Sequence, residues 1–349
     1  MNTKSGQQPS GAAGATVAID GPTNILLIEG LTMATVTDQY LADITAAAPD
    51  GSTIEVVGSL KDAAPHAPEV EVILGVLNRR FLADAPKLRW VHATASGVDM
   101  FMFDEFINSD VVLTGEKGLV GGHLADTGMG LLLALTRQIH TAIKLGPEAW
   151  ANRVDMRARE IELEGMTMGI LGFGGTGRAM ARRAVAFGMQ TIAVDEFPAP
   201  ADSLPADCGV SEVWPIDRFD DLLAQSDVVA VCCPLTESTD KLFDTATFAK
   251  MRVGSYIVNV TRGEIIDDEP LVAALESGRL AGAALDVAPG EPLPADHRLF
   301  SLDNVAMTPH TAGASQLRAP KNVARFVRNL GLARRGEPLE GVVDKQLGY

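Results

Sequence analysis

A glycine-rich segment in the middle of the chain has the spacing of a phosphate-binding turn. Gly172, Gly174 and Gly177 come after the apolar run 168–171 and lead into a helical pattern over 179–187. The first glycine permits a tight turn, the second lets a phosphate approach the backbone, and the third lets the helix pack close to the strand. The amides and the positive dipole end of the helix favour phosphate. We therefore expect a dinucleotide to bind here.

An acidic residue indicates which dinucleotide this is. Asp195 follows the apolar run 191–194, at roughly the distance of about 20 residues at which a carboxylate accepts hydrogen bonds from the adenosine ribose. The same charge would repel a 2′-phosphate. The sequence therefore predicts NAD(H) rather than NADP(H).

Three ionisable residues in the second half each come shortly after an apolar run that reads as a strand. They are Arg262, Glu291 and His310. The runs are 256–260, 283–287 and 304–308. Ligands of a doubly wound sheet bind at the carboxyl ends of its strands, so we expect these side chains to meet at one rim.

A guanidinium, a carboxylate and an imidazole together suit the reduction of a 2-keto acid. Arg262 can form two hydrogen bonds to a substrate carboxylate and polarise the neighbouring carbonyl. His310, when protonated, can donate a proton to the carbonyl oxygen as a hydride arrives, and Glu291 can orient the imidazole and favour its charged form.

The composition limits the classes of partner. The chain has 349 residues and a formal net charge of −16, and such an acidic protein is repelled by nucleic-acid phosphates and anionic lipids. Its longest apolar stretch, 128–135, is too short to span a bilayer. We therefore expect a small-molecule substrate and neither nucleic-acid nor membrane partners.

The three cysteines indicate a reducing compartment. Cys232 and Cys233 are adjacent on an apparent strand, so their side chains point to opposite faces and cannot easily pair, and Cys208 makes the number odd. No cysteine or histidine has the spacing of a metal site. We expect ordinary core thiols, no metal and a cytoplasmic location.

Short apolar runs alternate with helical patterns from residue 24 onward, which is typical of an α/β fold. Six strands are expected after a long helix over 121–139, and this number suits a doubly wound sheet. The strands expected earlier are 25–28, 54–57, 72–76 and 88–92, and the other helices expected are 36–48 and 316–333.

The length predicts two domains. Because the dinucleotide motif lies between α/β segments, we predict that one domain is inserted into the other. The inserted domain is an NAD-binding Rossmann domain over 121–313, and the discontinuous substrate domain, which is flavodoxin-like, covers 22–120 and 314–349. The active site is expected in the cleft between them. Residues 1–21, rich in Gly, Ser, Ala and Gln, are predicted to be a disordered tail.

Several motifs in order along the chain resemble the D-isomer-specific 2-hydroxyacid dehydrogenase family. Besides the glycine motif they are LRWVHATASGVD at 88–99, VCCPLTESTDKLF at 231–243, NVTRGEIID at 259–267, ALDVAPGEPLP at 284–294 and TPHTAG at 308–313. The resemblance covers the chain from about residue 24 to its end, and glyoxylate and hydroxypyruvate reductases are the members it suggests.

The resemblance implies two Rossmann-like domains, a homodimer, a D-2-hydroxy acid product, and catalysis by Arg262, Glu291 and His310. Arg262 and His310 would also contact the substrate, whose carboxylate would bind the backbone amides of Gly97 and Val98, as an anion binds a backbone nest. The implied cofactor contacts are Gly172, Phe173, Gly174, Gly175, Thr176, Gly177, Asp195, Cys233, Pro234, Thr239, Val260 and Asp286, the last of these to the nicotinamide carboxamide.

Two other functions remain open. Transcriptional corepressors related to this family sense NAD(H) and can retain the same three catalytic residues, so the chain could be an interaction protein without significant turnover. Formate dehydrogenases share the architecture, but they pair the histidine with glutamine, and Glu291 argues against that reading. The identity of the 2-keto acid is left undetermined.

Overall fold

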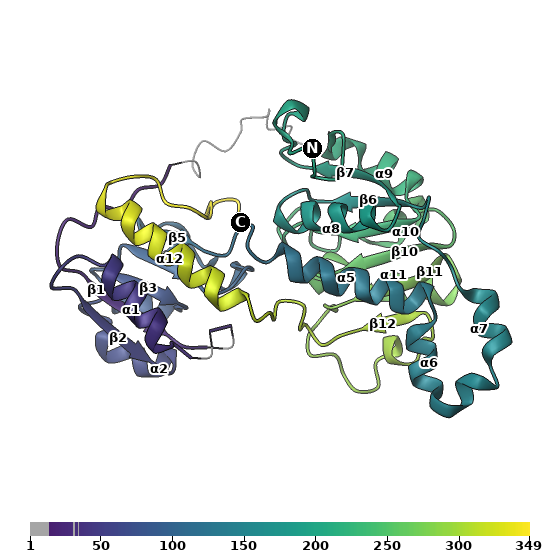
Figure 1. Ribbon diagram of the computed structural model, residues 1–349, viewed down its shortest axis with the longest axis horizontal. Helices are drawn as coiled ribbons and strands as arrows, with labels where there is room; N and C mark the ends of the chain where they lie inside the picture. Colours follow the sequence, from purple (N-terminus) through teal and green to yellow (C-terminus); the bar gives the residue numbers. More distant parts are fainter. Residues whose placement is uncertain (1–13, 31, 34) are drawn as a thin grey trace. The chain divides into compact units, whose positions relative to one another are not determined.

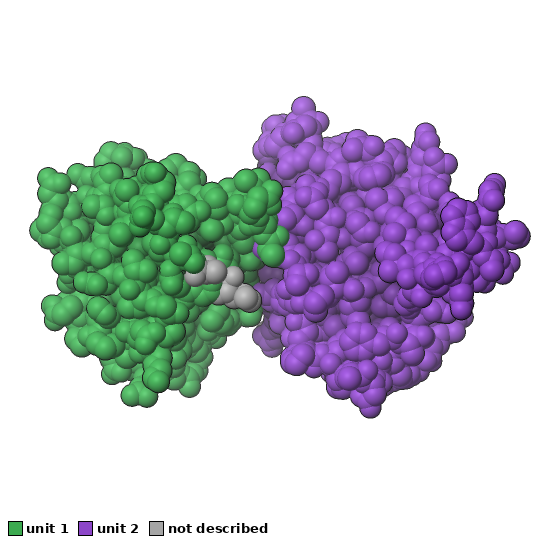
Figure 2. Space-filling model, turned by 60° about the horizontal axis from the view of Figure 1, so that its bottom comes forward, with its two compact units in different colours: residues 1–120, 314–349 green, residues 121–313 purple. Residues whose placement is uncertain are grey.

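The computed structural model describes residues 14–30, 32–33 and 35–349. Its chain forms two compact units (Figure 2), and each has α/β architecture. Unit 1 contains the chain up to Val120 together with Ala314–Tyr349, and unit 2 is Gly121–Gly313.

In unit 1 the described strands form a five-stranded parallel sheet in the order β2-β1-β3-β4-β5. The strands are β1 Asn24–Ile28, β2 Thr53–Val57, β3 Val72–Gly75, β4 Trp90–Ala93 and β5 Val112–Thr114. This is the flavodoxin-like order, so the predicted fold class of this unit is confirmed. The sequence analysis missed β5, an edge strand of three residues that pairs with β4.

Helices cover this sheet (Figure 1). Those described in unit 1 are α1 Asp38–Ala47, α2 Leu60–Ala63, α3 Arg79–Ala83, α4 Asp104–Ile107 and α12 Arg318–Arg334. Thr37 caps α1, because its side chain accepts a hydrogen bond from the amide of Tyr40 at 3.2 Å. On α12, Val323, Phe326 and Leu330 recur at helical spacing and belong to the same buried cluster as Trp90.

The predicted disordered tail is wrong for residues 14–21, while residues 1–13 lie outside the described part. Val17 and Ile19 are buried in the cluster that contains Trp90. The carbonyl of Ala15 accepts a hydrogen bond from the amide of Leu339 at 3.0 Å. Composition suggested disorder, but apolar residues at alternate positions supply enough burial to hold this segment.

Unit 2 has a parallel sheet whose seven described strands have the order β12-β11-β10-β9-β6-β7-β8. Its strands are β6 Thr167–Leu171, β7 Gln190–Asp195, β8 Val213–Pro215, β9 Val228–Val231, β10 Ser255–Asn259, β11 Leu280–Leu285 and β12 Val305–Met307. This is the Rossmann order, which confirms the predicted class. The sequence analysis gave six strands and missed the short edge strand β8.

The helices described in unit 2 are α5 Gly121–Thr136, α6 Ile139–Leu145, α7 Arg153–Arg159, α8 Gly175–Ala186, α9 Phe219–Gln225, α10 Thr245–Lys250 and α11 Asp268–Glu276. The predicted helix over 121–139 ends earlier, because Gln138 has a left-handed backbone with φ of 53°. Helices α5 and α8 pack closely, since a Cβ on Gly121 would overlap the carbonyl of Gly175.

Within the described ranges, no helix combines the length and the apolar character needed to cross a membrane.

A buried histidine lies in the sheet of unit 1. His92, on β4, has no exposed surface, and its Nδ1 is 2.7 Å from Thr114 Oγ1. Its Nε2 is buried without a hydrogen-bond partner in the described part of the chain. Burial, assisted by the positive charge of Arg325, lowers the pKa of His92 to about 3. The ring is therefore neutral in the folded protein.

We predict that His92 makes unit 1 sensitive to acid. Its folded pKa lies below the ordinary value of 6.5, so below pH 6.5 the unfolded chain binds more protons and the free energy of unfolding falls by about 1.4 kcal/mol per pH unit until about pH 3. Urea unfolding at several pH values, followed by Trp90 fluorescence in a Trp150→Phe, Trp214→Phe background, measures this slope. His92→Gln should reduce it by about that amount; equal slopes in both proteins would contradict the prediction.

Candidate functional site

The glycine motif forms the turn between β6 and α8. Gly172 has a φ of 89°, and a Cβ there would lie 2.7 Å from Cys233 Cα. A Cβ on Gly177 would overlap the carbonyl oxygen of Gly172, so the helix packs directly on the turn. A Cβ on Gly174 would meet no atom within 4 Å. Only glycine fits at the first and third positions, and the second faces open space, as the approach of a pyrophosphate requires.

Helix α8 presents its first turn beside this open space. The helix begins at Gly175 and Thr176, and its N-cap residue, Gly174, has no side chain that could accept a hydrogen bond from the first amides. Unpaired amides at the positive end of a helix of this length form an anion site. The residues present therefore fit the phosphates of a dinucleotide.

Asp195 is the last residue of β7 and helps to fix the glycine turn. One carboxylate oxygen accepts a hydrogen bond from the amide of Phe173 at 2.6 Å, and the other from the amide of Phe197 at 2.9 Å. Each oxygen keeps a second lone pair. The geometry leaves Asp195 able to accept further hydrogen bonds from a ribose.

The other predicted cofactor residues follow β9 and β10. Cys233 is buried, and burial raises the pKa of its thiol to about 12, so it is a neutral core residue. The hydroxyl of Thr239 donates to the carbonyl of Pro234 at 2.8 Å and holds this loop. Val260, directly after β10, is buried.

Asp286 follows β11, and its carboxylate is almost completely buried. It accepts hydrogen bonds from the Thr308 hydroxyl at 2.7 Å and from the amides of Thr311 and Ala312, each at 2.9 Å. Its backbone carbonyl accepts the amide of His310 at 2.7 Å. In this structure Asp286 therefore fixes the loop after β12, and the contact with nicotinamide stays a prediction.

His310 and Glu291 form a close pair. Nδ1 of His310 is 2.7 Å from one carboxylate oxygen of Glu291. The other oxygen of Glu291 accepts a hydrogen bond from the amide of Ala288 at 2.9 Å. Because Nδ1 faces a carboxylate, it carries the proton of that bond, and Nε2 is left for another partner. The backbone of His310 has a φ of 53°, a left-handed conformation that costs free energy and that the bonds to Asp286 hold in place.

Arg262 lies in the loop that follows β10. The side-chain amide of the fully buried Asn259 donates to the carbonyl of Arg262 at 2.8 Å. A Cβ on Gly263 would overlap the carbonyl of Ala288. The loop of Arg262 therefore lies in backbone contact with the loop that leads to Glu291.

Gly97 and Val98 belong to unit 1, where they follow β4. Val98 is buried and precedes a short 3-10 turn, Asp99–Phe101. The start of this loop is held by Asn322 on α12, whose amide donates to the carbonyl of Ala93 at 3.2 Å. The two predicted carboxylate-binding amides thus lie at the carboxyl end of a strand of their own sheet.

The remaining predicted residues all lie at or beyond the carboxyl ends of strands in the unit 2 sheet. Sequence reasoning missed the residues that hold the loops there, namely Asn259, Gly263 and Thr308. One signal was available: Asn259 is a polar residue within the apolar run 256–260, and a buried amide in such a run needs partners that the fold must supply.

Comparisons with known proteins identify the family. The family model described as D-isomer specific 2-hydroxyacid dehydrogenase, NAD binding domain, matches residues 129–312. Glyoxylate reductase from Korarchaeum cryptofilum is 31% identical over 283 residues, which are 80% of this chain and 82% of that protein. Hydroxypyruvate reductase from Thermotoga maritima is 35% identical over 265 residues, which are 73% of this chain and 82% of that protein.

A solved structure extends the similarity to the whole fold. The D-isomer specific 2-hydroxyacid dehydrogenase from Xanthobacter autotrophicus Py2, in complex with NADPH and MES, is 26% identical. Its TM-score is 0.74, and the match covers 96% of this chain and 100% of that one.

We predict that Asp286→Asn loosens the loop after β12. The new NH2 group cannot accept hydrogen bonds, but it must face at least one of the groups that now donate to the carboxylate. A hydrogen bond to a charged acceptor, worth about 1.5–3 kcal/mol, is therefore lost. Hydrogen exchange of the Thr311 and Ala312 amides should become at least about tenfold faster. The control is Asp303→Asn, an exposed carboxylate before β12; equal exchange in both variants would show that Asp286 does not hold the loop.

Proposed function

Because the chain belongs to the D-isomer-specific 2-hydroxyacid dehydrogenase family, we propose that it interconverts a small 2-keto acid and a D-2-hydroxy acid, with unit 1 as the substrate domain. The family enzymes are NAD-dependent oxidoreductases, and unit 2 contains the NAD-binding domain. The observation that carries the proposal is the 2.7 Å contact between His310 and Glu291. The names of the relatives support glyoxylate or hydroxypyruvate as the substrate.

His310 acts as the general acid in the reduction. Glu291 holds Nδ1 and stabilises the charged imidazolium, so that Nε2 donates its proton to the carbonyl oxygen of the substrate. The dinucleotide, when bound, supplies the hydride that the carbonyl carbon receives. In the reverse direction Nε2 takes the proton from the hydroxyl group, so the same residue is the general base.

Arg262 and the loop of unit 1 orient the substrate. The guanidinium of Arg262 binds the carboxylate and the carbonyl oxygen, which places positive charge where negative charge develops. The amides of Gly97 and Val98 bind the carboxylate as a backbone nest does. Two anchors on one small acid fix the face of the carbonyl that is reduced, and the family to which the chain belongs implies that this face gives the D product.

We expect His310→Gln to lower kcat by about 10²–10⁴-fold, the contribution of a positioned acid. NADH oxidation at 340 nm with glyoxylate, hydroxypyruvate, pyruvate and phenylpyruvate measures the loss. NADH binding, followed by fluorescence, should be unchanged because His310 is outside the glycine turn. Undiminished turnover in the variant would overturn the assignment of His310.

A second expectation concerns the cofactor. The carboxylate of Asp195 should make kcat/KM for NADH at least about tenfold higher than for NADPH, since repulsion of a 2′-phosphate costs more than about 1.4 kcal/mol. Asp195→Asn keeps a hydrogen-bonding side chain, removes the charge, and should narrow this ratio. One relative was crystallised with NADPH, so both cofactors should be measured. If Asp195→Asn leaves the ratio of kcat/KM for NADH to that for NADPH unchanged, another residue discriminates between the two cofactors.

We also propose that the protein is a homodimer formed through the segment α6–α7. Ile143, Trp150 and Val154 are 75%, 82% and 78% exposed on this segment. Such an apolar cluster on a soluble enzyme fits an interface between copies. Ile143→Ser with Trp150→Ser should halve the mass measured by sedimentation, whereas Val253→Ser, which removes an equally exposed side chain elsewhere, should not.

We propose a cytoplasmic location as well. The cysteines Cys208, Cys232 and Cys233 are free and buried, and thiols that stay reduced are typical of a reducing compartment.

A further inference from the structure

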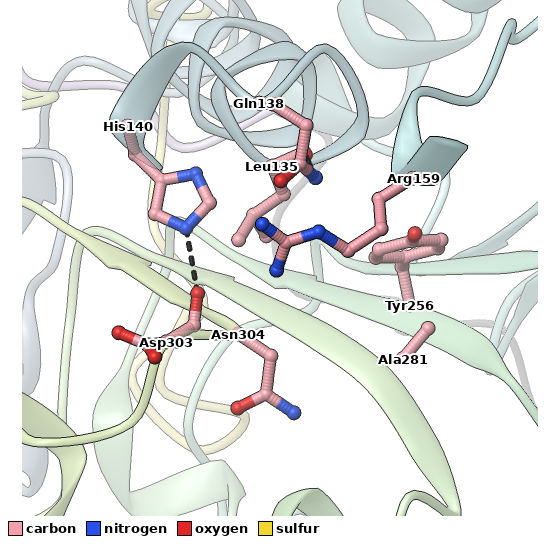
Figure 3. A pocket seen from close by; sticks show the side chains of 8 residues that line it. All are labelled: Leu135, Gln138, His140, Arg159, Tyr256, Ala281, Asp303 and Asn304. Atoms are coloured by element: carbon pink, nitrogen blue, oxygen red, sulfur yellow. Dashed lines mark hydrogen bonds between the residues drawn. The ribbon is translucent and has the colours of Figure 1, made fainter. Parts of the chain in front are cut away.

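Unit 2 has a cavity of about 280 Å³ at the amino-terminal edge of its sheet (Figure 3). Tyr256 on β10, Ala281 on β11 and Asn304 before β12 form one wall. Leu135 at the end of α5, His140 on α6 and Arg159 at the end of α7 form the other. The volume is just below the range of about 300–1,000 Å³ for ligand sites, so it suits only a small metabolite.

The cavity is separate from the candidate active site but is joined to it by three strands. β10, β11 and β12 begin at the cavity, and they lead to the loops of Arg262, Glu291 and His310. β10 and β11, with five and six residues, span about 17–20 Å. A ligand in the cavity therefore touches neither the glycine turn nor these three residues.

A buried phenol faces the cavity without a partner. Tyr256 is only 7% exposed, and no hydrogen bond to its hydroxyl is found within the described part of the chain. Burial raises the pKa of this hydroxyl, so the group remains a neutral donor. The hydroxyl oxygen itself is open to the cavity, so a ligand oxygen can reach it and accept its hydrogen bond.

A guanidinium extends into the cavity. Figure 3 shows that of Arg159 extending toward Gln138 and His140, and its Nε donates a hydrogen bond to the carbonyl of Asp155 at 3.4 Å. Asp303 is the acidic residue in the lining, and its carboxylate is 93% exposed and lies 3.7 Å from Lys144.

His140 is held in the wall of the cavity by contacts of both ring nitrogens. Nδ1 is 2.8 Å from the carbonyl of Ala134 and Nε2 is 2.6 Å from the carbonyl of Asp303.

We propose that this cavity is a second binding site, which takes a small organic carboxylate. Arg159 binds the carboxylate with its planar fork, and the Tyr256 hydroxyl donates a further hydrogen bond to it. The amide of Asn304 supplies polar contacts for the rest of the molecule, and Leu135 and Ala281 contact its apolar part.

Fluorine NMR of protein labelled with 3-fluorotyrosine tests the proposal directly. The chain has three tyrosines, Tyr40, Tyr256 and Tyr349, and Tyr256→Phe identifies the resonance of Tyr256. Sodium malonate added at constant ionic strength to the full-length protein with NADH should shift the Tyr256 resonance to saturation. The resonances of Tyr40 and Tyr349 should not move with it.

Matched variants identify the site. Arg159→Gln should raise the malonate midpoint at least about tenfold, the effect of losing a hydrogen bond to a charged group. Arg157→Gln removes the same charge two residues earlier on α7, at a position that does not line the cavity, and should leave the midpoint unchanged. KM for the keto acid should be equal in all three proteins, which separates this site from the proposed catalytic one.

Three results would overturn the proposal. A Tyr256 resonance that does not respond would mean that the cavity is closed, for example by a side chain of a second copy. An equal midpoint in Arg159→Gln would place the binding elsewhere. Equal midpoints for malonate, inorganic phosphate and sulfate would show an adventitious ion only.

Discussion

The buried carboxylate of Asp286 accepts three hydrogen bonds from residues 308–312, and the position of His310 depends on them. The loop turns back directly after β12, so its amides have no strand to pair with and need an acceptor. Asp286, at the end of the neighbouring strand β11, supplies this acceptor. Its backbone carbonyl also accepts a hydrogen bond from the amide of His310. The imidazole is thereby held in a left-handed backbone conformation and turned toward Glu291. A site assembled in this way is formed before any substrate arrives.

Two close backbone contacts determine how near the loops of the site lie to one another. The end of β9 approaches the glycine turn at Gly172, and the loop of Ala288 approaches that of Arg262 at Gly263. A side chain at either glycine would overlap main-chain atoms, which cannot move without displacing a strand or its loop. The parallel sheet brings the loops to one edge, and the glycines determine how near to one another the loops lie. The predicted cofactor-binding and catalytic residues of unit 2 therefore lie along the same edge.

Most of the fold could be read from the sequence, because apolar runs bounded by turn residues mark buried parallel strands. The errors have physical causes. β5 and β8 are three-residue edge strands with little periodicity to detect. Residues 14–21 have the composition of a linker, yet Val17 and Ile19 are buried because a sheet and α12 are present to cover them. Their order depends on tertiary contacts that local composition does not contain.

The sequence by itself determined the glycine turn, the acidic end of β7, and the three ionisable residues that follow strands. These features depend on residues that are close together in the chain, so residue type and spacing are enough to predict them. Only the tertiary structure decided which groups hold those residues. Asp286 joins β11 to the residues after β12 through the hydroxyl of Thr308, and to β10 through the carbonyl of Asn259. The charged residues around the cavity at the opposite edge, Arg159 and Asp303, are more than 100 residues apart. Such pairings depend on how the strands are ordered in the sheet, and that order is a property of the folded chain.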